Sequence, residues 1–250
     1  TMDLASGTLD LDNGVFGGAL GTLFGTLQNG TLVGSTLTSS NGTLDTMVFG
    51  SNLTASGTLN IRNSLTLADG IVVNKGNSAW RFTTTGVLPI AMVGGTGSAT
   101  INNAGGALTA GWGTGGQSLQ IGSGVTLQGY GSLGQSSIAT IINNGTIIGN
   151  TGGQTFTINP STFTNNGNLS ATAGTLNVSA TTVTNSASGS INYAAGTTGT
   201  INPTNFSNAG SLTVNGTTFT LAPATSFNNT GTMAFNNGTI ALGGVFPLSE

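Results

Sequence analysis

The chain has 250 residues, of which only 4% are charged, and it contains neither histidine nor cysteine. This composition argues against zinc sites and against triads that need a His or Cys, and no cofactor is expected. Three Lys and Arg residues against six Asp and Glu residues also argue against a nucleic-acid partner, because binding phosphates requires clustered basic side chains.

Hydrophobic residues make up 36% of the chain and the mean hydropathy is +0.20, which is too apolar for a disordered chain. No apolar run approaches the roughly 20 residues of a membrane helix, so this segment is not expected to insert into a membrane. The 43 glycines and the scarcity of Glu, Lys and Gln argue against long helices.

Residues 1–93 carry a loose Gly-Thr-Leu repeat. In each copy we expect Gly to supply the turn dihedral, Thr to face outward and Leu to face inward. Residues 74–86 hold Trp80 and several charges, and they are predicted to leave the repeat as a loop. The copies begin at Gly7, Gly21, Gly25, Gly30, Gly42 and Gly57.

Residues 94–117 are Gly-rich and predict irregular coils. The stretch 111–116 resembles a phosphate loop only in its Gly content, since the Lys-Ser/Thr ending is missing. Residues 118–242 carry regular repeats, and residues 243–250 are expected to form an exit segment.

Turn glycines recur at a nearly constant spacing in the regular part, at Gly145, Gly167, Gly189, Gly210 and Gly231. A fixed period of about 21 residues indicates a solenoid. Three apolar columns follow from the period, because alternation along short strands sends these residues to one face. The columns are Ile158, Val178, Ile201, Leu221; Phe163, Val183, Phe206, Phe227; and Leu169, Ile191, Leu212, Met233.

The predicted fold is therefore all-β: a single right-handed parallel β-helix (β-solenoid) spanning 1–250, with about 11–13 coils of about 20–22 residues stacked about 4.8 Å apart. The right hand is expected because parallel crossovers favour it.

Residues 119–133, together with the motifs Asn-Asn-Gly-Thr-Ile at 143–147 and Phe-Thr-Asn-Asn-Gly-Asn-Leu at 163–169, resemble a known class. They are similar to the β-helix regions of large bacterial surface proteins, namely autotransporter passenger domains and filamentous-haemagglutinin-like adhesins. The resemblance covers 119–240 well and 1–70 loosely. It implies an extended stalk for adhesion, cell contact or matrix building, and it transfers no catalytic residue.

Few side chains offer chemistry. Asp10 and Asp12 are weak candidates for binding Ca²⁺ or for acid–base work, and a solvated strand end is the preferred interpretation. A cluster of the charges at Arg62, Asp69, Lys75 and Arg81 would suit a polysaccharide-degrading enzyme, but a surface ion pair or a solubilised loop is preferred.

Three aromatic residues, Trp80, Trp112 and Tyr130, are candidates for stacking on glycans, with partial burial as the alternative. Thr-x-Thr pairs at 155–157, 162–164 and 218–220 would suit an ice-binding face, yet no regular Thr array over adjacent coils is visible in the sequence.

Asn-x-Ser/Thr is a glycan acceptor in secreted proteins, and here it also matches the Asn-Gly-Thr turns. Several of these Asn are alternatively expected to form stacked ladders inside the helix. The motif occurs at Asn29, Asn41, Asn52, Asn144, Asn168, Asn177, Asn205, Asn215, Asn228 and Asn237.

The expected function is an extracellular, non-enzymatic structural or adhesive segment at a bacterial cell surface. Its expected partners are further coils, either in another copy stacked end to end or in a longer chain, and also surface glycans or host cells. A carbohydrate-binding or polysaccharide-degrading β-helix and an ice-binding solenoid are the alternatives.

Overall fold

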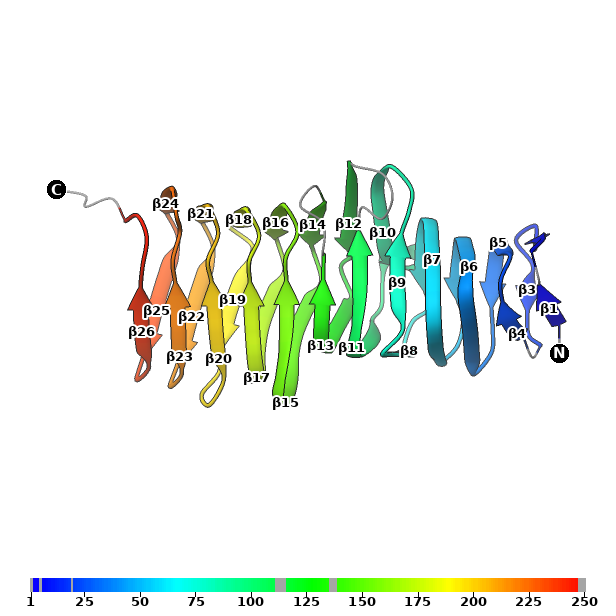
Figure 1. The fold of residues 1–250 in the computed structure, drawn as a ribbon, viewed down its shortest axis with the longest axis horizontal. Helices are drawn as coiled ribbons and strands as arrows, with labels where there is room; N and C mark the ends of the chain where they lie inside the picture. Colours follow the sequence, from blue (N-terminus) through cyan, green and yellow to red (C-terminus); the bar gives the residue numbers. More distant parts are fainter. Residues whose placement is uncertain (1, 5, 19, 111–115, 135–138, 247–250) are drawn as a thin grey trace.

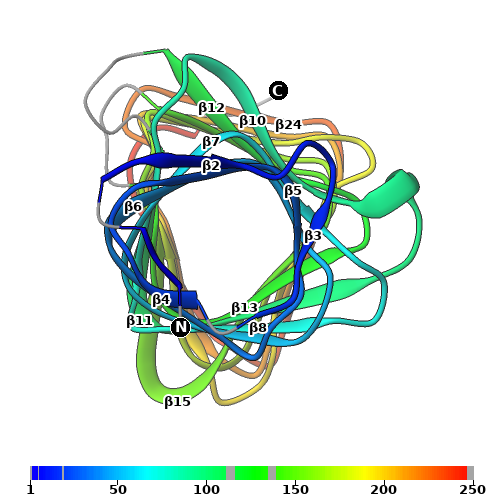
Figure 2. The same cartoon turned by 90° about the vertical axis from the view of Figure 1, so that its right-hand side faces the viewer.

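The computed structural model describes residues 2–4, 6–18, 20–110, 116–134 and 139–246. It is an all-β solenoid of about 11 turns built from stacked parallel strands (Figure 1). Viewed from the N-terminal end, the chain runs clockwise as it recedes, so the solenoid is right-handed (Figure 2). The predicted fold class is confirmed.

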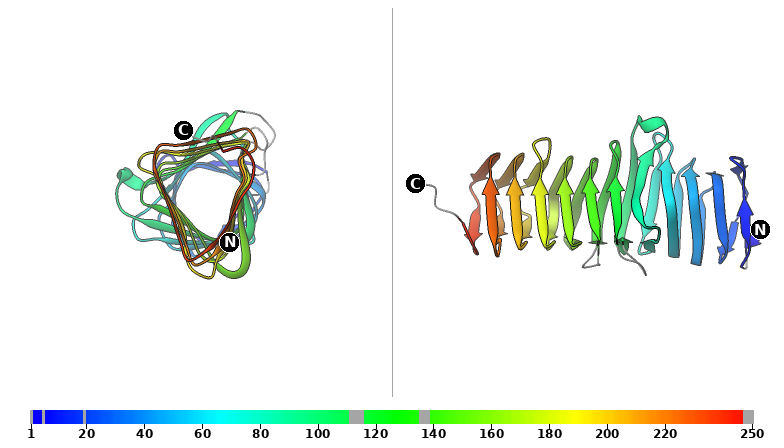
Figure 3. Two further views of the ribbon diagram at one scale, coloured as in Figure 1. Left: turned by 90° about the vertical axis from the view of Figure 1, so that its left-hand side faces the viewer. Right: turned by 90° about the horizontal axis from the view of Figure 1, so that it is seen from above.

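Each coil crosses three flat walls, named here faces B, C and A in chain order, which give the rod a triangular cross-section (Figure 3). Long strands bend around a corner and serve two or three faces. Face A contains β3 (Val15–Phe16), the ends of β5 (Thr26–Leu32), β6 (Thr36–Phe49) and β7 (Leu53–Leu67), β10 (Gly86–Met92), β12 (Gln117–Ile121), β14 (Thr140–Asn143), β16 (Thr162–Asn165), β18 (Thr182–Asn185), β21 (Asn205–Asn208) and β24 (Ser226–Asn229).

Faces B and C share the longest strands. Face B contains β1 (Met2–Leu4), β4 (Leu20–Leu23), the starts of β6 and β7, β8 (Val72–Gly76), the starts of β11 (Ala99–Ala110), β13 (Val125–Leu133), β15 (Thr146–Ile158) and β17 (Asn168–Val178), then β19 (Ser190–Tyr193), β22 (Ser211–Asn215) and β25 (Thr232–Asn236). Face C contains β2 (Thr8–Asp10), the start of β5, the middle parts of β6 and β7, β9 (Ala79–Phe82), the ends of β11, β13, β15 and β17, then β20 (Thr198–Ile201), β23 (Thr218–Leu221) and β26 (Thr239–Leu242).

Coil length varies more than the constant period predicted. Thr36 pairs with Thr54, 18 positions later, whereas Val73 pairs with Ile101, 28 positions later. The short coils belong to the irregular Gly-Thr-Leu region. The long coil accommodates extra residues between faces, including the 3-10 helix η1 (Val93–Gly95). The predicted coil length of about 20–22 residues therefore does not hold outside the regular repeats.

Residues 74–86 do not form the predicted loop, because most of them lie in β8, β9 and the start of β10. Trp80 and Phe82 are fully buried, in register with Leu59 and Ile61 of the preceding coil. Trp80 and Phe82 alternate with Ala79 and Arg81, as the inward and outward residues of a strand do. The charged residues nearby obscured this alternation in the sequence.

The Gly-rich region is also more regular than expected where it is described. β11 is 12 residues long, and its Ile101 and Leu108 are buried, while residues 111–115 lie outside the described part. At the other end, residues 243–246 still follow the coil instead of leaving it. Gly243 N donates to Leu221 O at 3.0 Å and Val245 N to Pro223 O at 2.8 Å.

The three predicted apolar columns are present in register. Their members in the last coil, Phe227 and Met233, are half-buried, and Leu221 and all earlier members are buried. The pairings run Ile158–Val178–Ile201–Leu221, Phe163–Val183–Phe206–Phe227 and Leu169–Ile191–Leu212–Met233.

The turn glycines are needed for close approach between coils. Gly167, Gly210 and Gly231 do not have a positive φ, but a Cβ on each would collide with a carbonyl oxygen of the coil before. In the N-terminal Asn-Gly turns it is Asn29 and Asn41 that adopt the left-handed conformation, with φ of 53° and 61°. The expected dihedral role of the Gly in Gly-Thr-Leu is thus wrong for these two turns.

Gly199 provides space for a large interior side chain. It occupies an inward position between Leu176 and Phe219, and a Cβ there would overlap the ring of Tyr193. That buried ring packs on Phe219 with a centroid distance of 4.7 Å.

Gly199→Ala should therefore lower the free energy of unfolding by about 3 kcal/mol, as expected for overpacking of a tight core. Gly152→Ala is the matched control, because a Cβ there meets nothing within 4 Å, and its effect should stay within about 0.5 kcal/mol. Thermal and urea melts followed by circular dichroism measure both. Equal stability of the two variants would contradict the packing described.

Candidate functional site

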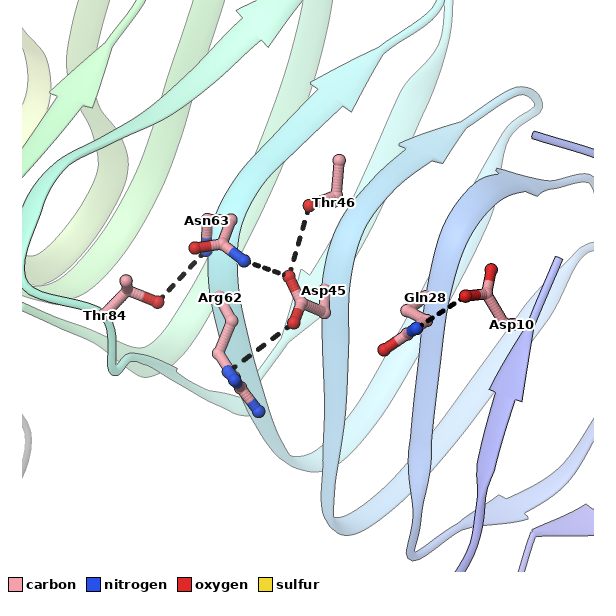
Figure 4. A network of polar contacts seen from close by, with 7 residues as sticks. All are labelled: Asp10, Gln28, Asp45, Thr46, Arg62, Asn63 and Thr84. Carbon is pink, nitrogen blue, oxygen red and sulfur yellow. Dashed lines mark hydrogen bonds and ion pairs between the residues drawn. The ribbon is translucent and has the colours of Figure 1, made fainter. Parts of the chain in front are cut away.

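Charged side chains gather at one corner of the N-terminal coils, where face C turns into face A (Figure 4). Asp10, Gln28, Asp45 and Arg62 occupy the same outward position in successive coils. We call this column the polar corner.

The Asp10 carboxylate is held by neutral donors. Its Oδ2 accepts hydrogen bonds from Gln28 Nε2 at 2.7 Å and Asn29 Nδ2 at 3.1 Å, and its Oδ1 accepts one from Asp12 N at 3.0 Å. The backbone hydrogen bond from Asp12, followed by those from Gln28 and Asn29, lowers the pKa of Asp10. Asp10 is thus stabilised as a carboxylate.

Asp45 has a cationic partner as well as neutral donors. Arg62 Nε lies 3.6 Å from its Oδ2, and its Oδ1 accepts hydrogen bonds from Thr46 Oγ1 at 3.2 Å and from Asn63 Nδ2. Figure 4 shows these three partners around the carboxylate, with Thr84 beyond Asn63. The contacts of the corner form two separate groups, Asp10 with Gln28 and Asn29, and Asp45 with its partners in β6 and β7.

This arrangement does not favour acid–base catalysis. A glycosidase acid needs a raised pKa, and the pKa of Asp10 is lowered instead. Asp10 and Asp12 form a turn in which Asp12 and Asn13 have positive φ values of 46° and 64°. Among the described residues, no group of three or more Asp, Glu, His or Cys side chains is placed to hold a metal ion.

The four mid-chain charges weighed as a cluster are separated in the structure. Arg62 pairs with Asp45, Asp69 Oδ1 accepts from Ser98 N at 2.8 Å, and Arg81 Nη1 donates to Asn41 Oδ1 at 3.1 Å. Lys75 is not on the surface at all.

Lys75 is fully buried at the corner between faces B and C. Its Nζ donates to Asn103 Oδ1 at 2.9 Å and to the carbonyl oxygen of Ser78. Desolvation lowers the pKa of Lys75 to about 7. The sequence contained one signal of this burial. Lys75 lies two residues after Val73 in the same strand, and alternate residues of a strand point to the same side.

A second polar column lies inside the solenoid, at the corner where face A turns into face B. Each Asn before the last donates its Nδ2 to the Oδ1 of the Asn in the next coil, at distances of 2.7–2.8 Å, and again to a main-chain oxygen. The column, named here the Asn ladder, consists of Asn143, Asn165, Asn185, Asn208 and Asn229.

The interior ladder was predicted for the wrong asparagines. The Asn of the Asn-x-Ser/Thr motifs are not its members, and Asn144, Asn168 and Asn205 instead accept hydrogen bonds along the outer wall from Asn166, Ser190 and Ser226. Each ladder member is the last residue of its strand and has the inward phase, whereas the Asn-x-Ser/Thr motifs begin at other positions.

The two candidate glycan-stacking aromatics that the structure describes, Trp80 and Tyr130, are not exposed together as a platform. Trp80 is fully buried and packs edge-on against Phe49 at a centroid distance of 6.3 Å, so its predicted role is wrong. Trp112 lies outside the described residues, and Tyr130 is half-buried.

A regular Thr array, which the sequence did not reveal, lies on the outside of face C. One column consists entirely of threonine and the neighbouring column is interrupted twice. The columns are Thr155, Thr175, Thr198, Thr218, Thr239, and Thr157, Asn177, Thr200, Thr220, Ala241. The sequence hid this array because its Thr-x-Thr pairs belong to two faces: 155–157 and 218–220 lie on face C, and 162–164 lies on face A.

An open groove of about 270 Å³ runs beside this array at the corner between faces B and C. It is lined by Gly196, Thr197, Gly216, Thr217, Thr218, Asn237, Gly238 and Thr239, and none of these side chains is charged.

Comparison of the chain with protein-family models, with curated proteins and with solved structures finds no match. None of the helices in the described residues is both long enough and apolar enough to cross a membrane.

Asn185→Leu should lower the free energy of unfolding by about 2–4 kcal/mol, because the Asn165 amide loses its acceptor and the Asn208 oxygen its donor in a buried place. Asn177→Leu, on the outer wall, is the control and should change stability by less than about 1 kcal/mol. Hydrogen exchange should show faster exchange in β16, β18 and β21 only for the ladder variant. Unchanged exchange there would contradict the ladder.

Stability should rise from pH 7.5 to 9.5. In this window the unfolded Lys75, with a pKa near its ordinary value of about 10.4, binds a proton that the folded amine does not. The slope should approach about 1.4 kcal/mol per pH unit, since a single proton is linked to unfolding.

Lys75→Met should abolish most of this slope, as measured by urea midpoints at each pH. A wild-type midpoint that is flat between pH 7.5 and 9.5 would rule out the depressed pKa.

Proposed function

We propose that the chain is an extracellular structural or adhesive β-solenoid without enzymatic activity, either a rod segment of a bacterial surface adhesin or a subunit of a self-assembling fibre. The observation that carries the proposal is the parallel hydrogen-bonded stack, which continues through every described coil on the three faces. Such a rod spans distance and presents repeated surfaces, which is what a stalk requires.

The distribution of charge supports the structural role. No charged residue occurs between Arg81 and Glu250, so the regular repeats offer no acid, base or cationic group for chemistry. The carboxylates of Asp10 and Asp45 are already engaged in the polar corner. The location at a bacterial surface rests on the resemblance of the turn motifs to adhesin β-helices.

Association through the last coil is supported by its exposed edges. In the described residues, β24, β25 and β26 each pair with only one neighbouring strand. The inward residues Phe227, Met233 and Ile240 are only half-buried, and Phe246 covers part of this end by packing on Phe227 at 4.8 Å. Unpaired strand edges template further strands.

The first coils present a comparable surface. Leu9, Leu11 and Phe16 are half-buried and Val15 is 66% exposed. We propose that further coils cover these ends, supplied by a second copy or by a longer chain. The scarcity of charge removes the usual guard against such pairing. Surface glycans or partner cells are the proposed targets of the adhesive role.

Purified chain should form end-to-end particles whose length grows with concentration in sedimentation velocity and electron microscopy. Met233→Lys places a charge on the exposed last coil and should reduce this growth, because a charge cannot be buried there without a partner. Thr213→Lys, which faces outward one coil earlier, is the control and should assemble like wild type. Monodisperse wild-type particles at every concentration would contradict self-assembly.

A further inference from the structure

We propose that the outer surface of face C between β15 and β26, named here the threonine face, binds crystalline water at the surface of ice. The five strands form adjacent parallel arrows in Figure 1. This activity goes beyond the structural role proposed above and depends on a different surface from the ends of the rod.

Threonine is concentrated on this face and not on the other two. In the five coils concerned, eight of the ten outward positions of face C are Thr. The corresponding outward positions hold five Thr on face A and three on face B. Strand propensity would favour Thr on all three faces equally, so it does not account for the difference.

The backbone fixes the threonines on a grid. Neighbouring rungs are about 4.8 Å apart, and alternate residues of one strand are about 6.6 Å apart. The pairings from Thr175 to Thr239 run without a register shift. A rigid grid that repeats in two directions matches a partner that also repeats in two directions. Ice is such a partner, and its surface oxygens have spacings close to these.

The chemistry of the face suits ordered water. Each Thr offers one hydroxyl that both donates and accepts, as a lattice water does, and one methyl group that favours leaving the liquid. No charged residue lies on this surface, since none occurs between Arg81 and Glu250. Strongly hydrated charges would otherwise keep liquid water at the surface.

Two features limit the grid. Asn177 and Ala241 interrupt the second column. In the first column, the hydroxyls of Thr175 and Thr198 lie 2.6 Å apart and hydrogen-bond to each other. Contact with ice therefore requires rotation of at least one of these side chains toward the lattice.

The test compares two lysine substitutions at equivalent places. Thr200→Lys adds a charged side chain to the centre of the threonine face, and Thr184→Lys adds the same side chain at the second outward position of β18 on face A. Both strands have four residues and both positions are half-exposed. Circular dichroism confirms that each variant retains the fold.

Partition of labelled protein into a slowly growing ice crystal is the primary measurement, with thermal hysteresis as the second. We expect wild type and Thr184→Lys to enter the ice, and Thr200→Lys to enter about tenfold less, because a bulky charge holds the face away from the lattice. The proposal is overturned if wild type is excluded from ice, if Thr200→Lys enters like wild type, or if both variants lose binding equally. Rod assembly is scored separately by microscopy.

Discussion

Parallel backbone pairing between successive coils is the constraint on which the rest of the molecule depends. It places equivalent residues of neighbouring coils about 4.8 Å apart, so each interior side chain packs mainly on residues one coil before and one coil after it. Phe206 and Phe227 stack with a centroid distance of 5.8 Å for this reason. The same constraint makes Gly199 necessary, because the ring of Tyr193 fills the space that a side chain there would take. Energetic effects of substitution should accordingly remain local along the rod.

Repetition also decides which polar groups the interior tolerates. An Asn amide carries both donors and an acceptor, so it can be satisfied by another Asn above and below, and the Asn ladder extends through five coils. An ammonium group carries only donors and cannot be stacked in this way. Lys75 therefore occurs once, satisfied by Asn103 and Ser78, and burial shifts its pKa instead. Asp10 and Arg62 remain exposed in the polar corner, where Gln28 stands between Asp10 and Asp45 and Arg62 pairs with Asp45.

Much of the fold followed from the sequence, and the failures have physical causes. The columns through Ile158, Phe163 and Leu169 were predictable because a nearly constant period and strand alternation agree there. Trp80 and Lys75 were predicted to lie at the surface because of the chemistry of their side chains, although both occupy inward positions in their strands. The threonine face was missed because the Thr-x-Thr pairs seen in the sequence lie on two different faces of the solenoid. The Asn ladder was expected among the Asn-x-Ser/Thr motifs, whereas its members are the last residues of the face A strands.

Each coil of the chain adds one rung to the rod, and a distance measured along the rod tests this most directly. The chain has no cysteine, so Thr54→Cys and Thr213→Cys can be spin-labelled without background. Both positions face outward on face B and are separated by seven rungs, from β7 to β22. Double electron–electron resonance should give one narrow distribution of label-to-label distances centred at about 34 Å, as seven spacings of about 4.8 Å require. A broad distribution, or a centre displaced by two rungs or more, would contradict the account.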